Sequence, residues 1–125
     1  MKRHENREKA VICIYQYLMM ERDIDELIAD NFTEEEQADD PYMIQVVHTA
    51  KDNIERYAGY IDQVLDGWTY ERLGYIEKAI ILCGCSEFDQ KQIEAAVIID
   101  EYVRLAKKFC DSDSYKLING VLDRI

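Results

Sequence analysis

The chain of 125 residues has only one proline and five glycines, and it has no long apolar run. So few chain-breaking residues exclude collagen-like and linker-like architectures. No stretch of about 18 apolar residues is present, which excludes a membrane-spanning helix. The first residues are polar and basic, so we expect no secretion signal and a cytoplasmic location. Hydrophobic residues still make up 48% of the chain. That is enough for a real core in a domain of this size.

Basic residues are also scarce. The chain has 15 basic and 26 acidic residues, which gives a net charge of −11. Affinity for nucleic acid needs cations that displace the counterions of the phosphates. Only residues 1–22 have a cationic excess, with five basic and three acidic side chains, whereas residues 23–66 have two basic and 13 acidic ones. We therefore expect any RNA contact to begin at the N-terminus, and the acidic middle to attract a basic protein.

Apolar residues recur at steps of three and four along most of the chain, which is typical of helices. This spacing predicts helices over about 5–20, 24–31, 74–89 and 93–109, and a last one that includes Leu117 and Ile125. A longer seam runs from Met43 to Trp68, and we expect a bend or break in it at Gly59. Pro41 is suited to the first turn of the helix that begins this seam, and Asp40 or Asp39 can cap it. The predicted fold is all-α, with six or seven helices in two packed subdomains, residues 1–66 and 67–125.

The residue types that carry catalysis or bind metals are few and poorly spaced. Cys83 and Cys85 would point to opposite sides of a helix, so we expect buried free thiols rather than a metal site. Cys13 and Cys110 are expected to be small core or helix-end residues, and His48 a partly exposed helix residue. No phosphate loop or nucleophile motif is present. The sequence therefore predicts no cofactor, and it disfavours an enzyme.

Basic residues gather at the start of the first predicted helix, where the helix dipole is positive and disfavours them. Lys2, Arg3, Arg7 and Lys9 form this group. A ligand phosphate would explain their position, and a solvated, disordered tail is the alternative. Tyr15 lies just downstream and is either a core residue or a ring on which an unpaired RNA base stacks.

The C-terminal third resembles the end of the NusB transcription antitermination family. Residues 100–109 are similar to the family pattern N-E-A-x-x-L-A-K-x-F-G, and residues 113–123 to D-S-x-K-F-V-N-G-V-L-D. Trp68 with residues 72–80 is similar to W-x-x-x-R-L-x-x-V-E-K-A-I, and residues 7–15 to R-E-x-A-x-x-x-L-Y. These segments follow one another in order over nearly the whole chain.

The resemblance implies a seven-helix fold and a non-catalytic role in transcription. Family members bind NusE, a ribosomal protein, and the pair binds single-stranded boxA RNA and supports the transcription elongation complex on ribosomal RNA operons. Matched by position, the RNA-contacting residues are Lys2, Arg3, Arg7 and Tyr15. The residues near the surface for the partner and RNA are Glu87, Asp113, Lys116 and Leu117. The resemblance leaves open whether the protein forms a homodimer.

Departures from the family pattern suggest an alternative function. Leu82 replaces an arginine, Cys110 replaces the glycine that ends a helix, and Leu117 replaces a phenylalanine. In a left-handed helix end, Cys110 would cost about 1 kcal/mol or more. The alternative is a divergent helical adaptor that has lost RNA binding and engages only proteins.

Several of these residues also have structural interpretations. Asp113 and Ser114 are suited to cap the last helix, and Leu117 is suited to the core. We expect Trp68 in the core, and Gly120 at a close contact between helices.

Overall fold

The computed structural model describes residues 2–125. These residues form eight α helices and one 3₁₀ turn and contain no strand. The elements are α1 (Arg3–Met20), α2 (Ile24–Asn31), α3 (Glu34–Asp39), α4 (Pro41–Asp52), α5 (Ile54–Val64), η1 (Tyr70–Arg72), α6 (Tyr75–Gln90), α7 (Ala95–Phe109) and α8 (Ser112–Arg124). The predicted all-α class is confirmed, and the helix count is close to the predicted six or seven. No helix in this part of the chain is long and apolar enough to cross a membrane.

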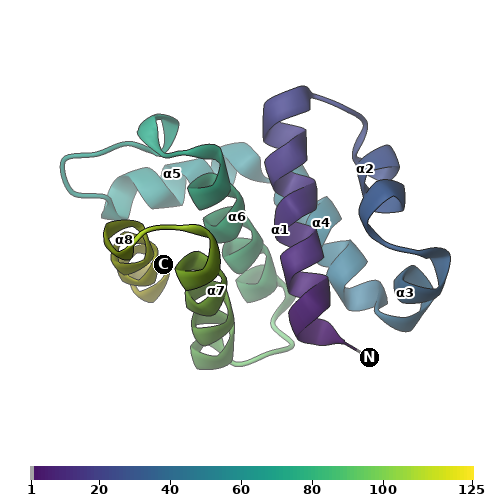
Figure 1. Ribbon diagram of the computed structural model, residues 1–125. Coiled ribbons are helices and arrows are strands. Elements are labelled where there is room, and N and C mark those ends of the chain that lie inside the picture. The colour runs from purple at the N-terminus through teal and green to yellow at the C-terminus, as the bar shows by residue number, and fades with distance from the viewer. Residues whose placement is uncertain (1) are drawn as a thin grey trace.

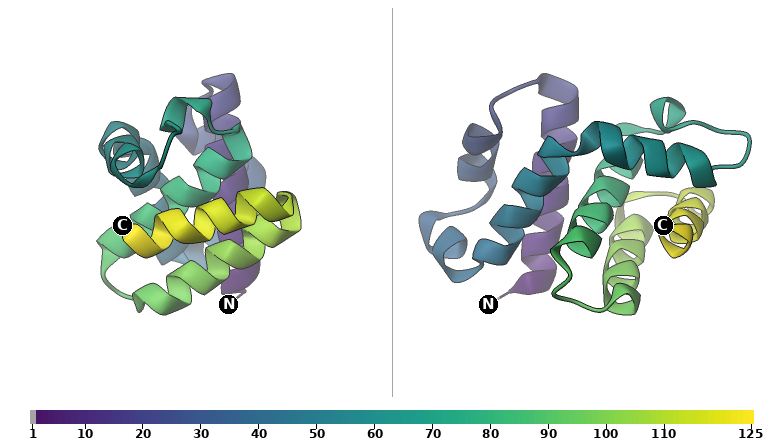
Figure 2. Two further views of the ribbon diagram at one scale, coloured as in Figure 1. Left: turned by 90° about the vertical axis from the view of Figure 1, so that its left-hand side faces the viewer. Right: turned by 180° about the vertical axis from the view of Figure 1, so that it is seen from behind.

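Helix α6 is the centre of the fold. Every residue from Lys78 to Glu87 is buried, because α1 and α4 pack on one side of the helix and α7 and α8 on the other. Helices α2 and α3 lie beyond α1 and α4, and α5 leads to the opposite end of the molecule (Figures 1 and 2). One apolar core therefore extends from α2 to α8.

The polar stretch before Pro41 contains a helix that apolar spacing could not reveal. Thr33 accepts a hydrogen bond from the backbone N–H of Glu36, whose carboxylate accepts one from the N–H of Thr33. This reciprocal capping box starts α3, a helix without a buried residue. The predicted start of the next helix is confirmed, since Pro41 opens α4 and Asp40 caps it by accepting from the N–H of Met43.

The break in the long seam lies at Asn53, so the expected break at Gly59 is wrong. Asn53 leaves the helical conformation, and its side-chain amide donates to the carbonyl of Thr49. Gly59 lies inside α5 with open space around its Cα. An asparagine side chain that bonds to the backbone of the preceding turn competes with helical hydrogen bonding. Here this competition interrupts the helix, whereas the exposed glycine does not.

The loop after α5 corrects a second expectation. Trp68 is 42% exposed, so it is not a core residue, and the guanidinium of Arg72 lies over its ring. Gly67, with a φ of 70°, turns the chain just before it. The seam spacing continued through Trp68, but α5 ends at Val64 and the later residues of the pattern no longer share a helix face.

Two expectations for α8 are also wrong, those for its cap and for Gly120, and the cost considered at Cys110 does not arise. Asp111 caps the helix by accepting from the N–H of Ser114, so neither Asp113 nor Ser114 is the cap. Cys110 is extended, with a φ of −123°, and its replacement of glycine therefore causes no strain. Open space surrounds Gly120.

The close helix contact instead involves Gly84. A Cβ there would lie 2.9 Å from Leu122 Cδ2, so this glycine allows α6 to approach α8.

The cysteines and His48 lie where the sequence places them. Cys13, Cys83 and Cys85 are buried free thiols, and Cys110 is partly buried at a helix end. Burial raises the pKa of Cys13 and of Cys85 to about 12. His48 is partly exposed, 3.5 Å from Asp25.

Candidate nucleic-acid interface

The basic residues at the start of α1 are folded against the protein, and each is paired with an acidic side chain. Arg3 donates from Nε to Asp40 Oδ2 at 2.8 Å, and its guanidinium lies 4.7 Å from the centre of the Tyr42 ring. Lys9 pairs with Glu36. Lys2 is the most exposed of the group, with Glu5 at 4.0 Å. The disordered-tail alternative is therefore wrong from Arg3 onward, where the helix begins.

Arg7 turns inward and is only 4% exposed. Its Nε donates to Glu87 Oε2 at 2.7 Å and its Nη2 to Oε1 at 3.0 Å. Burial opposes the charge on the guanidinium, but the hydrogen bonds and charge of Glu87 outweigh it and raise the pKa of Arg7. The ion pair fixes α1 to α6 at the centre of the molecule.

Glu87 is fully buried and accepts from two tyrosines as well. Tyr42 of α4 donates its hydroxyl at 2.8 Å, and Tyr102 of α7 donates at 2.5 Å. Burial, with the nearby Glu87 charge, raises the pKa of both phenols well above its usual range, so both remain donors. This buried network joins four helices through one carboxylate, and it satisfies that carboxylate with four hydrogen bonds.

Helix α7 lies between α1 and α8 and is held to α1 by charged side chains (Figure 1). Glu101 of α7 is 2.6 Å from His4 Nδ1 and 3.6 Å from Arg7 Nη1. Lys108, in the last turn of α7, reaches Glu8 at 2.6 Å. Burial acts to raise the pKa of Glu101, but the hydrogen bonds from His4 and Arg104 and the charge of Arg7 lower it overall.

The structure brings together two residues to which the family resemblance assigned different contacts. Arg7 was expected to contact RNA and Glu87 to lie near the surface for the partner and RNA, and they bind each other inside the protein. Both assignments stay predictions, and burial of the two side chains speaks against direct contact in this conformation.

The other predicted residues lie at or near the surface. Lys2, Asp113 and Lys116 are exposed, the last two in the first turns of α8. Tyr15 and Leu117 are partly buried and pack against the core, and their contacts with RNA and the partner stay predictions. No group of three histidine, cysteine or acidic side chains among residues 2–125 could hold a metal ion.

Sequence reasoning missed the residues that complete the buried network. Asp40 was expected only as a helix cap, yet it is 1% exposed and also accepts from Arg3 and Asn6. Tyr42 and Tyr102 were not identified from the sequence as part of a site. A buried acidic residue inside an apolar helix was the one available signal, because Glu87 follows the apolar run of α6.

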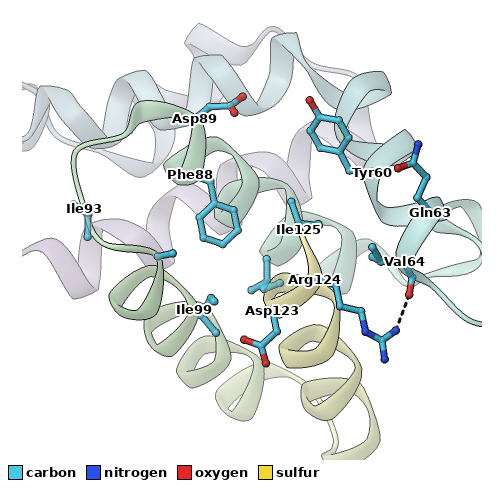
Figure 3. A pocket seen from close by; sticks show the side chains of 12 residues that line it. Tyr60, Gln63, Val64, Phe88, Asp89, Ile93, Ile99, Asp123, Arg124 and Ile125 are labelled. Carbon is cyan, nitrogen blue, oxygen red and sulfur yellow. Dashed lines mark hydrogen bonds between the residues drawn. The ribbon is translucent and has the colours of Figure 1, made fainter.

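An open groove of about 610 Å³ lies beside the C-terminal end of α6 and the start of α7. Phe88, Ile93 and Ile99 give it an apolar wall, and Asp123 lies at its edge (Figure 3). Arg124 donates to the carbonyl of Val64 at 3.0 Å and closes one side. The sequence did not predict this groove, since its residues come from α5, α6, α7, α8 and the loop before α7.

Comparisons with known proteins agree with the sequence motifs over the full length of the chain. The model of the NusB family matches residues 4–125. The transcription antitermination protein NusB of Exiguobacterium sp. (strain ATCC BAA-1283 / AT1b) is 36% identical over 126 residues, which cover 100% of this chain and 97% of that protein. The NusB of Shouchella clausii (strain KSM-K16) is 32% identical, over 98% of this chain and 92% of its own length.

Two solved structures show the same fold. T. maritima NusB superposes with a TM-score of 0.89 at 22% identity, over 99% of this chain and 89% of that one. A crystal structure of the antitermination factors NusB and NusE in complex with dsRNA contains a chain with a TM-score of 0.85 and 27% identity, over 97% of this chain and 92% of that one.

Proposed function

The chain belongs to the NusB family, and on that premise we propose that it is a non-catalytic transcription antitermination factor. It pairs with the ribosomal protein NusE and binds boxA-type RNA in nascent ribosomal RNA transcripts, in the cytoplasm. One observation carries the proposal: the similarity to NusB proteins spans the chain, and one structure of the same fold was solved with NusE and RNA.

The charge distribution supports a basic protein partner. The net charge is −11, and residues 23–66 contain 13 of the 26 acidic side chains. An acidic surface accelerates association with a basic ribosomal protein and selects against acidic partners. Neutralising part of this charge also lowers the repulsion that RNA would meet on approach.

The start of α1 supports a modest contribution of its own to RNA binding. Lys2 is exposed and held only by a distant Glu5. Arg3 lies at the surface but shares its charge with Asp40. We assign contact with RNA phosphates to Lys2 and Arg3, and to Lys116 on α8, and we assign Arg7 a positioning role, because it fixes the helix that carries the first two.

The proposal is tested by fluorescence anisotropy of labelled single-stranded boxA-type RNA, with and without NusE, at two salt concentrations. We expect weak, salt-sensitive binding by the protein alone and tighter binding with NusE. Replacing both Lys2 and Arg3 with glutamine should lower the slope of log affinity against log salt by at most about 1.4, since each phosphate contact to a single strand contributes about 0.7.

Arg22 provides the matched control. It is an exposed arginine that follows the other end of α1, about 27 Å from the first residues of the helix. Arg22→Gln should leave the salt slope unchanged. If NusE binds but adds nothing to RNA affinity, the proposal fails in favour of the alternative, a protein-interaction adaptor that has lost RNA binding.

A further inference from the structure

Among the described residues 2–125, the lysines and arginines that lack an acidic partner all lie in the second half of the chain. Among residues 2–125, each lysine or arginine up to Arg56 pairs with a carboxylate. Beyond that point, only Arg104 and Lys108 do so. The cations without such a pair are Arg72, Lys78, Lys91, Lys107, Lys116 and Arg124. The positive potential that the sequence placed at the N-terminus is therefore largely neutralised there, and free positive charge lies elsewhere.

Two of these cations lie against aromatic rings at the turn between α5 and α6. Arg72 is 4.3 Å from the centre of the Trp68 ring. Lys78 Nζ is 4.9 Å from the Tyr70 ring and 5.5 Å from the Tyr75 ring. Such contacts orient a cation while leaving its N–H groups without an anionic acceptor. We call the group Trp68, Arg72, Tyr75 and Lys78 the tryptophan corner.

Lys78 is the most unusual member because it is only 8% exposed. Lysine is almost never buried to this extent without an opposite charge. Its ammonium group lies near two tyrosine rings, and among residues 2–125 this ammonium has no hydrogen bond or ion pair. An anion that reaches the mouth of this site would supply the missing acceptor.

The rings of the corner are accessible. Trp68 is 42% exposed and Tyr75 is 49% exposed, and the two rings alternate with the two cations in sequence. The corner also lies at the end of the molecule that contains the start of α8, away from α2 and α3 (Figures 1 and 2). Glu77, next to Lys78, is close enough to Cys110 for its charge to act on that thiol.

We propose that the tryptophan corner is a second contact for single-stranded RNA, separate from the start of α1. Nucleobases stack on Trp68 and Tyr75, and a phosphate meets Arg72 and Lys78. Exposed aromatic rings interleaved with cations are what single-stranded nucleic acid requires, because every base has a face to stack and every linkage has a charge. A strongly basic protein would meet Arg72 and Lys78 as like charges, so RNA is the better fit. The proposal rests on the RNA binding proposed above and names where a further part of the strand lies.

Trp68 allows a direct test because it is the only tryptophan in the chain. Its fluorescence is followed while the protein alone, at low salt, is titrated with an oligouridylate of about 12 nucleotides. We expect saturable quenching at the RNA concentration that also saturates the anisotropy of a labelled copy. Trp68→Ala, followed by anisotropy, should weaken binding by about tenfold, since stacking of one base contributes on the order of that factor.

The charged residues are tested by Arg72→Gln and Lys78→Gln, each of which should lower the salt slope by about 0.7. Lys91→Gln is the matched control, because Lys91 is an exposed cation without an acidic partner at the other end of α6, about 20 Å away. Circular dichroism verifies that the Lys78 variant is folded, and the Arg72 variant, on an exposed side chain, tests the proposal independently.

The corner proposal is overturned if RNA binds the wild type while Trp68 emission stays constant and Arg72→Gln behaves like Lys91→Gln. Quenching by NusE without quenching by RNA would also overturn it and make the corner a protein contact. Failure of the function proposed above is a different result, namely no gain in boxA affinity on adding NusE. The oligouridylate titration does not depend on that gain.

Discussion

Arg7 of α1 and Glu87 of α6, which are 80 residues apart in sequence, form a two-point ion pair in the protein interior. Removing one partner of such a pair leaves an uncompensated buried charge, whereas replacing both with apolar residues of similar size is often neutral. Tyr42 and Tyr102 also donate to Glu87, so the loss of this carboxylate would leave their hydroxyls unpaired as well. The pair therefore determines how α1, α4, α6 and α7 fit together.

Replacing Arg7 with methionine should destabilise the protein by about 3–5 kcal/mol, because Glu87 would remain buried without its counter-charge. The free energy of unfolding is measured by urea denaturation followed by circular dichroism. Arg22→Met, which breaks an exposed pair with Asp30, should change the same quantity by at most about 1 kcal/mol.

The double variant Arg7→Met, Glu87→Met should recover a large part of the stability lost in Arg7→Met, because no isolated charge is left in the core. A double variant that is less stable than Arg7→Met by the full cost of a second lesion would contradict this account of the pair.

Acid should weaken the contact between α1 and α7. The native pKa of Glu101 is lowered from its ordinary value of 4.5, so its contribution to stability is complete above that value and is lost as pH falls through the lower native pKa. Between about pH 5 and pH 3, the urea midpoint of the wild type should therefore fall more steeply than that of Glu101→Gln. Parallel curves for the two proteins would show that Glu101 does not contribute.

Removing the hydroxyl of Tyr70 should not destabilise the protein. This oxygen is the one buried side-chain polar atom among residues 2–125 without a hydrogen-bond partner, and a buried, unpaired polar group costs about 1–3 kcal/mol. Tyr70→Phe should therefore leave the melting temperature unchanged or raise it. Tyr102→Phe is the matched control, since it removes a bonded hydroxyl from Glu87 and should lower the melting temperature.

The four cysteines should differ sharply in reactivity toward a thiol reagent such as Ellman's. Burial raises the pKa of Cys13, Cys83 and Cys85 and also keeps the reagent away from them. Cys110 is partly buried at the end of α7 and should be the one that reacts in the native protein. Unfolding in urea should release the remaining three, and Cys110→Ser should abolish the native reaction.

The features of the fold that could be predicted from sequence were those that neighbouring residues determine. Apolar spacing identified most helices, and Asp40 with Pro41 marked the start of α4 because a cap and a first-turn proline act within one turn. α3 was missed because it buries nothing and is held by a capping box. The break at Asn53 was missed because a hydrogen bond from this side chain to the carbonyl of Thr49 leaves no trace in hydrophobic spacing.

The candidate site was harder to predict, since it depends on pairings between distant residues. The sequence shows that Lys2, Arg3, Arg7 and Lys9 are basic. It does not show that the last three lie opposite acidic residues of α3, of α6 and of the junction between α3 and α4. Local charge therefore overestimated the free positive charge at the N-terminus. Local charge also does not identify the cations of the tryptophan corner, because they have acidic neighbours in sequence but contact aromatic rings in space.

The burial of α6 on all sides has a consequence for how the chain can be divided. α6 belongs to the second half of the sequence, yet it forms the wall against which α1 and α4 pack. A polypeptide cut in the loop between Leu65 and Thr69 would yield two fragments, each with an apolar surface that only the other can cover. Such fragments should be unfolded when separate and should reassemble when mixed, which makes this loop a natural position for a split-protein reporter.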